Sequence, residues 1–260
     1  MAEYKKITYE NSHYEGDTVD GKPHGKGKMI YENGNSYEGD FYKGVFHGFG
    51  VLKYSISERY EGDFFHGKRT GYGTVFYKNG SYVSGIFKDG FRYGYAESRD
   101  VRGAFSVGVY GKGGFKEISC DTPVCTVKSF DGSVYVGHII DKKRCGRGKC
   151  TYLNGSLYDG TWCDGKRHGR GKLTLRNGTV YEGIFMDGKM TGRGKMTYKD
   201  GSVYEGDFID GKRCGTGKLI YKNGDVYIGE FSKGKRHGYG ELTLSSGEVV
   251  HGIFKKDKLL

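Results

Sequence analysis

Proline and long apolar runs are scarce in this 260-residue chain, and each scarcity excludes a class of protein. Only 2 Pro accompany 48 Gly, a ratio unlike that of collagen or of proline-rich linkers. Aromatic residues make up 15% of the chain, which is too many for a disordered tract. Aliphatic side chains are too few to fill an ordinary core, so we expect the aromatic rings to supply most of the buried surface.

The absence of targeting signals bears on the location of the protein. No run of about 18 apolar residues is present, so we expect no transmembrane helix. The start, Met-Ala-Glu-Tyr-Lys-Lys, is not followed by the apolar segment of a signal peptide. We therefore predict a cytoplasmic protein, at a membrane or the cytoskeleton if it is peripheral, with reduced cysteines. A disulfide between Cys120 and Cys125 would need an oxidising compartment.

Charge is plentiful but uneven. The formal net charge is +11, of which residues 1–130 carry +2 and residues 131–260 carry +9. A basic half of this kind indicates either an anionic partner or a surface kept soluble by lysine and arginine.

What the chain has in abundance is one phrase repeated at a fixed spacing. Tyr37-Glu-Gly-Asp-Phe41 returns as Tyr60-Glu-Gly-Asp-Phe64 and as Tyr204-Glu-Gly-Asp-Phe208. Successive start points are 23 residues apart, except for a longer step from Ser106 to Tyr135. A fixed period of this size predicts a repeat array, in which each unit buries surface only against its neighbours. The start points are Tyr14, Tyr37, Tyr60, Val83, Ser106, Tyr135, Tyr158, Tyr181, Tyr204, Tyr227 and Val250.

Within one repeat, two alternating segments joined by turn residues predict a β-hairpin. In the repeat that starts at Tyr204, we expect a turn at 210–213 and a type I′ turn at Asn223-Gly224. The expected register places Phe208 opposite Gly215, Gly206 opposite Gly217, Tyr204 opposite Leu219 and Glu205 opposite Lys218. Tyr221 would share the face of Tyr204, and aromatic rings would lie over bare glycine backbone.

The phrase Tyr-Glu-Gly-x-Phe, followed by glycines at regular spacing, closely resembles the MORN (membrane occupation and recognition nexus) repeat. The resemblance runs from about residue 5 to 256. It implies an all-β fold, an elongated, grooved, single-layer antiparallel sheet of stacked β-hairpins. It also implies a role as a scaffold or membrane-associated adaptor that often self-associates.

The array is interrupted near its middle. Val83-Ser-Gly-Ile-Phe87 and Ser106-Val-Gly-Val-Tyr110 are degraded copies, and the extra residues fall in 111–130. We therefore expect an N-terminal block at 1–110, a bulged loop or hinge at 111–130 and a basic C-terminal block at 131–260. Val250-His-Gly-Ile-Phe254 would cap the end as a half repeat.

Two sets of side chains are candidates for binding. Basic residues in the turn after the first strand would line one edge of the sheet about 10 Å apart, where they meet anionic lipid or a partner, or only water. The aromatic rings would line a groove that holds a helical or extended segment of a protein. The basic set is Lys142, Lys143, Arg144, Lys166, Arg167, Lys212, Arg213, Lys235 and Arg236. The groove aromatics, whose own role we expect to be structural, are Tyr37, Phe41, Tyr60, Phe64, Tyr158, Trp162, Tyr181, Phe185, Tyr204, Phe208, Tyr227 and Phe231.

Other patterns are explained by the repeat itself. Gly-Arg-Gly-Lys at 146–149 lacks the spacing and the following Ser or Thr of a phosphate loop. His168 and Cys145 fall at one repeat position, so they do not indicate catalysis, and their spacing with Cys150 and Cys163 matches no zinc rule. We expect neither a cofactor nor a metal, and nucleic acid is not the expected partner. The predicted function is a non-enzymatic scaffold that binds a protein and forms homo-oligomers. The alternatives are a phosphoinositide-binding module and a regulatory subunit of an enzyme on another chain.

Overall fold

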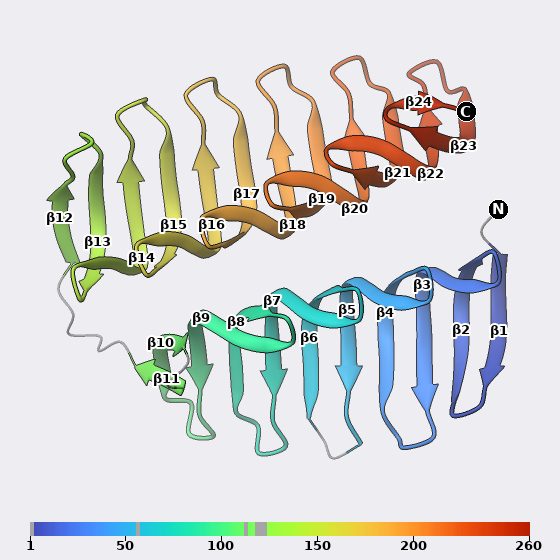
Figure 1. The fold of residues 1–260 in the computed structure, drawn as a ribbon, viewed down its shortest axis with the longest axis horizontal. Coiled ribbons are helices and arrows are strands. Elements are labelled where there is room, and N and C mark those ends of the chain that lie inside the picture. Colours follow the sequence, from blue (N-terminus) through green and yellow to red (C-terminus); the bar gives the residue numbers. More distant parts are fainter. Residues whose placement is uncertain (1–2, 56–57, 112–113, 118–123) are drawn as a thin grey trace. The chain divides into compact units, whose positions relative to one another are not determined.

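The computed structural model describes residues 3–55, 58–111, 114–117 and 124–260. Every regular element in these residues is a β-strand, and the strands form two compact units, Met1–Ser119 and Cys120–Leu260. Figure 1 shows each unit as an open sheet of successive hairpins. The predicted all-β array of antiparallel hairpins is confirmed, with the difference that the described strands form two sheets rather than one.

Unit 1 is an 11-stranded sheet in which each strand pairs with the next one along the chain. Its strands are β1 (Glu3–Tyr9), β2 (Ser12–Val19), β3 (Lys22–Tyr31), β4 (Ser36–Tyr42), β5 (Val45–Lys53), β6 (Arg59–Phe65), β7 (Lys68–Phe76), β8 (Tyr82–Lys88), β9 (Phe91–Arg99), β10 (Phe105–Gly111) and β11 (Gly114–Glu117).

Unit 2 is a 13-stranded sheet with the same sequential order. Its strands are β12 (Val124–Lys128), β13 (Val134–Ile140), β14 (Lys143–Thr151), β15 (Leu157–Cys163), β16 (Lys166–Thr174), β17 (Val180–Met186), β18 (Lys189–Thr197), β19 (Val203–Ile209), β20 (Lys212–Ile220), β21 (Val226–Ser232), β22 (Lys235–Thr243), β23 (Val249–Lys255) and β24 (Lys258–Leu259).

The segment 111–130, which was expected to form a loop or hinge, contains the boundary between the two units. Its described residues include strands β11 and β12. Cys125 lies in β12, and Cys120 lies outside the described residues.

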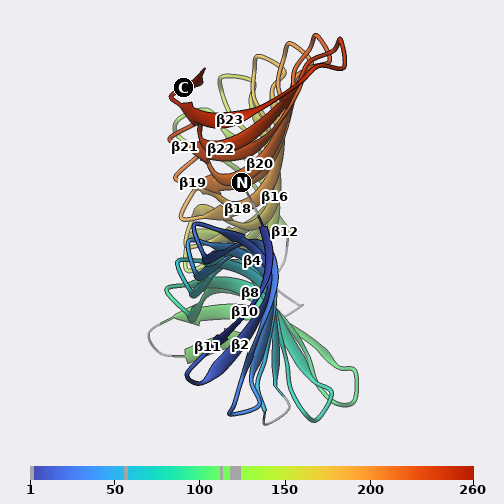
Figure 2. The same cartoon turned by 90° about the vertical axis from the view of Figure 1, so that its right-hand side faces the viewer.

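The predicted register is correct up to the glycine pair and wrong beyond it. Tyr204 pairs with Leu219, Glu205 with Lys218 and Gly206 with Gly217. The register then shifts, so that Phe208 lies opposite Arg213 rather than Gly215. Gly215 has a φ of +57°, a left-handed conformation that breaks the alternation, and such a bulge bends the strand. Figure 2 shows the resulting bend across the strands of each sheet.

The two turn predictions are also corrected. Asp210 and Gly211 both have positive φ, so the type I′ turn lies here, and Lys212 and Arg213 already belong to β20. At Asn223-Gly224 only the glycine has positive φ, and its N–H donates to the carbonyl of Tyr221 at 3.0 Å. This geometry is that of a type I turn followed by a left-handed glycine, the other common hairpin loop.

A tyrosine occupies each bend. A Cβ added to Gly217 would come within 2.5 Å of the Tyr204 ring, so the ring lies directly over the glycine backbone as predicted. The Tyr204 hydroxyl donates to the carbonyl of Asp207 at 3.0 Å, next to the register shift. The same bond, to the residue three positions on, forms at Tyr14, Tyr37, Tyr60, Tyr135, Tyr158, Tyr181 and Tyr227. The tyrosine therefore stabilises the bulge that bends each hairpin.

Candidate functional site

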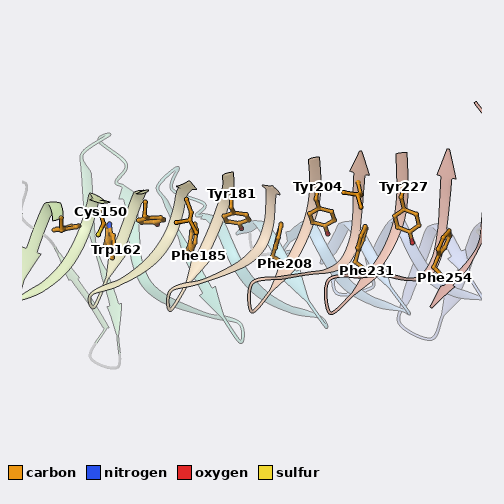
Figure 3. Packing of buried hydrophobic residues seen from close by; sticks show 13 residues of the cluster. Cys150, Trp162, Tyr181, Phe185, Tyr204, Phe208, Tyr227, Phe231 and Phe254 are labelled. Atoms are coloured by element: carbon orange, nitrogen blue, oxygen red, sulfur yellow. The ribbon is translucent and has the colours of Figure 1, made fainter. Parts of the chain in front are cut away.

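The predicted groove aromatics form the core of the two units. In unit 2, Tyr204 is 0% exposed and Phe208 is 1% exposed. Their rings meet edge to face, with centroids 5.2 Å apart, and Phe231 packs on Tyr204 in the same way at 4.9 Å. This tyrosine–phenylalanine ladder runs along the whole unit (Figure 3). The other predicted members are buried as well: Tyr37, Phe41, Tyr60, Phe64, Tyr158, Trp162, Tyr181, Phe185 and Tyr227.

This burial corrects the expectation that these rings line an open groove. Rings that are 0–4% exposed stabilise the sheet but have no surface left for a partner. Any partner on this face must contact the residues that lie over the ladder.

Arginines form the first of two rows over the ladder. The Arg213 guanidinium lies 5.5 Å from the Tyr204 ring centroid and 5.2 Å from that of Phe231, within cation–π range. Its Nε and Nη2 atoms donate to the carbonyl of Gly234, at 3.1 and 2.6 Å. Equivalent stacking is made by Arg144, Arg167 and Arg236. In the repeat that starts at Tyr181, the corresponding residue is Met190.

Residues that open the loops between hairpins form the second row. Tyr198 and Tyr221 are half-buried against the core, and Arg213 and Arg236 lie 5.9 Å from their respective ring centroids. Burial raises the pKa of both phenols and the nearby arginines oppose this rise, so the hydroxyls are neutral donors at physiological pH. The same loop position is held by Tyr152, Leu175 and Leu244.

We call these two rows together the Tyr–Arg surface. Its members are Arg144, Arg167, Met190, Arg213 and Arg236 in the first row and Tyr152, Leu175, Tyr198, Tyr221 and Leu244 in the second. Successive members of a row are two strands apart, so they repeat about every 10 Å. A hollow of about 450 Å³ opens beside Tyr221, Arg236 and Leu242, where Asp200 and Asp225 of the loops border it.

The structure separates the predicted lysines from the predicted arginines. Lys212 and Arg213 are neighbours in a strand, so their side chains leave opposite faces of the sheet. The arginine is half-buried in the Tyr–Arg surface, whereas the lysine is exposed. Lys142, Lys143, Lys166 and Lys235 are likewise exposed, and Arg144, Arg167 and Arg236 are likewise half-buried.

Some of the exposed lysines near the hairpin turns form ion pairs with an aspartate of the next turn. Lys143 pairs with Asp164, and Lys189 pairs with Asp210 at 2.9 Å. The last two hairpin turns of unit 2 carry Lys233 and Lys256 where its earlier turns carry Asp. Six exposed lysines near these turns have no ion pair within the described part of the chain, and we call them the C-terminal lysine cluster: Lys212, Lys233, Lys235, Lys255, Lys256 and Lys258.

Sequence reasoning missed six members of this surface. The predicted site residues did not include Tyr152, Leu175, Met190, Tyr198, Tyr221 and Leu244. The signal for the tyrosines was their constant place just before each Asn-Gly or Asp-Gly turn. Met190 interrupts a row that is otherwise arginine, which becomes visible only when the repeats are compared position by position.

Metal sites and membrane-spanning helices are two further classes of feature that bear on function. Among the described residues, no group of three or more His, Cys, Asp or Glu side chains is placed to hold a metal ion. Over the same residues, no helix has the length and apolarity needed to cross a membrane.

Comparison with protein families identifies the repeat. The family model described as "MORN repeat" matches eight segments: residues 14–36, 37–58, 60–82, 135–157, 158–180, 181–203, 204–226 and 227–249. No curated protein matches the chain.

Solved structures that resemble the chain are only distantly similar. The Drosophila melanogaster SAS-4 (dCPAP) TCP domain, in complex with a proline-rich motif of Ana2 (dSTIL), is 14% identical. The match covers 70% of this chain and 84% of that domain, with a TM-score of 0.34. The Danio rerio CPAP TCP10 domain, in complex with a STIL peptide, is 11% identical over 98% of this chain and 99% of that one, with a TM-score of 0.29.

Proposed function

Because this chain belongs to the MORN repeat family, we propose that it is a non-enzymatic scaffold whose Tyr–Arg surface binds a segment of a partner protein. One observation carries the proposal. Rings and guanidinium groups stand half-exposed in two rows, fixed in place by the buried ladder beneath them. Tyrosine and arginine are the residues most enriched among those that dominate protein–protein binding energy.

The electrostatics of the surface favour a partner that carries acids. Within the described residues, Arg167 and Arg213 form no ion pair, and their bonds go to the carbonyls of Gly188 and Gly234. These two guanidinium groups are already held in place, so binding a partner would cost little side-chain entropy at the arginines.

Selection from a random peptide library on the full-length chain tests this proposal. The variant Tyr198→Ser/Tyr221→Ser removes two rings of the Tyr–Arg surface, and Ser129 shows that serine occurs at the same loop position. The control is Tyr239→Ser, which removes a ring from the opposite face of the same sheet. We expect peptides that bind the wild type and the control but not the double variant. Recovery of no such peptide would overturn the proposal.

A second candidate function, contact with a membrane that contains phosphoinositide, is favoured by the C-terminal lysine cluster. Each lysine near an anionic membrane contributes about 1 kcal/mol, so six of them support peripheral binding. Unlike Lys143 and Lys189, these lysines form no ion pair with another described residue.

Co-sedimentation with phosphatidylcholine vesicles, with and without a few percent of phosphoinositide, tests the second function. Replacing Lys233, Lys235 and Lys256 by Gln should abolish binding at about 0.15 M salt, where the Debye length is about 8 Å. The control removes three lysines outside the cluster, replacing Lys143, Lys166 and Lys189 by Gln, and should bind as the wild type does. Equal losses in both variants would contradict a role specific to the cluster.

Self-association, a cytoplasmic location and a regulatory role toward an enzyme on another chain stay predictions. The open edge strands β1 and β24 are consistent with self-association, because an unpaired strand edge can accept another strand.

A further inference from the structure

The first row of the Tyr–Arg surface consists of arginines except at its central position, which is a methionine. Reading along the unit, the residues are Arg144, Arg167, Met190, Arg213 and Arg236. Met190 is half-buried against the core, and its methyl group lies against Gly211. The chain therefore carries an apolar position flanked on each side by cations about 10 Å away.

Neighbouring residues extend this apolar position. Leu175 opens the loop beside Met190, as Tyr198 does beside Arg213, and it is 39% exposed. Met196 is half-buried next to them, at the position that Leu242 holds beside Arg236. Methionine is unbranched and flexible, so this apolar notch, formed by Leu175, Met190 and Met196, suits an aliphatic side chain of varying shape.

The guanidinium groups of Arg167 and Arg213, which flank the apolar notch, keep hydrogen-bond donors available for a partner. Arg167 bonds to Gly188 through Nη2, and Arg213 bonds to Gly234 through Nε and Nη2. In each guanidinium the Nη1 atom is bonded to none of the residues that the structure describes. A carboxylate can therefore approach either arginine without displacing the bond that holds it.

The hydroxyl groups of the second row favour an extended occupant over a helical one. Tyr198 and Tyr221 have no hydrogen-bond acceptor for their hydroxyls among the described residues. An extended chain exposes its backbone carbonyls, whereas a helix keeps them bonded internally. In the extended polyproline II conformation, three residues make one turn of about 9 Å, close to the ~10 Å between successive members of a row, and side chains three positions apart share a face.

We propose that the occupant of the Tyr–Arg surface is an extended segment in the polyproline II conformation, with an aliphatic residue in the apolar notch and an acidic residue three positions before and three positions after it. The inference rests on the proposed function and specifies the partner for the same surface. The carboxylates would contact Arg167 and Arg213, about 19 Å apart, a distance that six extended residues span.

Sequencing the peptides recovered from a library about twelve residues long, enough to cross four repeats when extended, tests this inference. Peptides that require Tyr198 and Tyr221 should share an aliphatic residue with acids three positions to either side. Replacing one of these acids by Gln should weaken binding about tenfold or more.

Two variants built from residues that this chain already uses at the same repeat position provide the matched control. Selection on Met190→Arg should replace the aliphatic preference by an acidic one. Selection on Arg213→Met should replace one acid by a second aliphatic residue. Both variants keep a side chain that another repeat accommodates, so we expect them to fold.

The failures of the two proposals are distinguishable. Peptides that depend on Tyr198 and Tyr221 but show acids six or seven positions from the aliphatic residue would indicate a helix, at 1.5 Å per residue, and would overturn the extended segment alone. A preference that is unchanged in Met190→Arg would also overturn it. Absence of any peptide that depends on these tyrosines would overturn the proposed function as well.

Discussion

At the scale of the residue, one tyrosine per repeat connects the composition of the chain to its bend. The ring needs bare backbone beneath it, which explains why glycine and aromatic residues are abundant together. Its hydroxyl bonds to the carbonyl beside the register shift, so the polar atom of the ring is satisfied although it is buried. In most phrases the fifth residue is a phenylalanine, such as Phe208, which joins one tyrosine to the next.

Truncation of one such phenylalanine should weaken the whole unit. Phe208 is 1% exposed and packs edge to face on Tyr181 and Tyr204, with centroids 4.9 and 5.2 Å away. We expect Phe208→Ala to lower the free energy of unfolding by about 3 kcal/mol or more, measured by urea denaturation. The control Ile228→Ala truncates a side chain that is 50% exposed and should lower it by under about 1 kcal/mol. Equal losses would refute the ladder as the core.

A buried histidine in unit 1 predicts a specific dependence on pH. His47 is 5% exposed, and burial, aided by His66, lowers its pKa from 6.5 to about 4. The folded state therefore disfavours the charged form. The contribution of the neutral side chain is complete above pH 6.5 and is lost as the pH falls from 6.5 toward 4, up to about 3 kcal/mol.

Urea denaturation across that pH range, compared with His47→Thr, isolates this contribution from that of the carboxylates. Thr70 holds the same position in the next repeat, so the replacement is one that the array uses. The stability of the wild type should fall toward that of the variant as the solution is acidified. If the free energy of unfolding changed with pH by the same amount in both proteins, His47 would not titrate as described.

At the scale of the element, each regular repeat combines two turns, one within its hairpin and one leading to the next hairpin, with one bulge. The type I′ turn requires two residues with positive φ, which Asp-Gly supplies at 20–21, 89–90, 164–165, 187–188 and 210–211. Between β13 and β14 the second of these residues is Lys142, with a φ of +63°. A residue other than glycine pays about 1–2 kcal/mol for this conformation.

Exchanging glycine and lysine between two equivalent turns tests this strain. Lys142→Gly should raise the free energy of unfolding by about 1 kcal/mol. The reverse change in the next hairpin, Gly165→Lys, should lower it by a similar amount, because a Cβ at Gly165 meets no atom within 4 Å and only the backbone conformation is strained. Thermal denaturation of both variants measures these changes. A loss of stability in Lys142→Gly would contradict the proposal that Lys142 is strained by its positive φ.

The strand register was predicted correctly where side chains alternate regularly between the two faces of the sheet, and wrongly where the bulge interrupts this alternation. The pairs Tyr204–Leu219 and Gly206–Gly217 followed from alternation and are confirmed. Phe208 was misplaced because the left-handed Gly215 inserts a shift that no pattern of apolar residues records. The roles of Lys212 and Arg213 were merged because both were assigned to the turn. In the structure they begin β20, so the arginine faces the rings and the lysine faces water.

At the scale of the whole molecule, the chain holds two separate cores. One cluster contains Tyr37 and Phe41 in unit 1, and the other contains Tyr204 and Phe208 in unit 2. The excess of positive charge belongs to the second half of the chain, and the Tyr–Arg surface and the C-terminal lysine cluster both lie in unit 2. We infer that binding is concentrated in this unit.

Separate cores should produce separate unfolding transitions. Trp162, the one tryptophan of the sequence, lies in the core of unit 2, so its fluorescence follows that unit while circular dichroism follows both. Phe41→Ala should shift the dichroism transition in urea and leave the fluorescence transition in place. Phe208→Ala should shift both signals. Movement of the fluorescence transition in Phe41→Ala would mean that the two units unfold together.

The most direct test of the central claim is the affinity of one selected peptide for three proteins, measured by fluorescence anisotropy. These are the wild type, Tyr198→Ser/Tyr221→Ser and the opposite-face control Tyr239→Ser. If the Tyr–Arg surface is the binding site, the double variant binds at least tenfold more weakly, a loss of about 1.4 kcal/mol, and the control binds as the wild type does. Full affinity in the double variant, together with a loss in Tyr239→Ser, would place the site on the other face of the sheet and contradict the account.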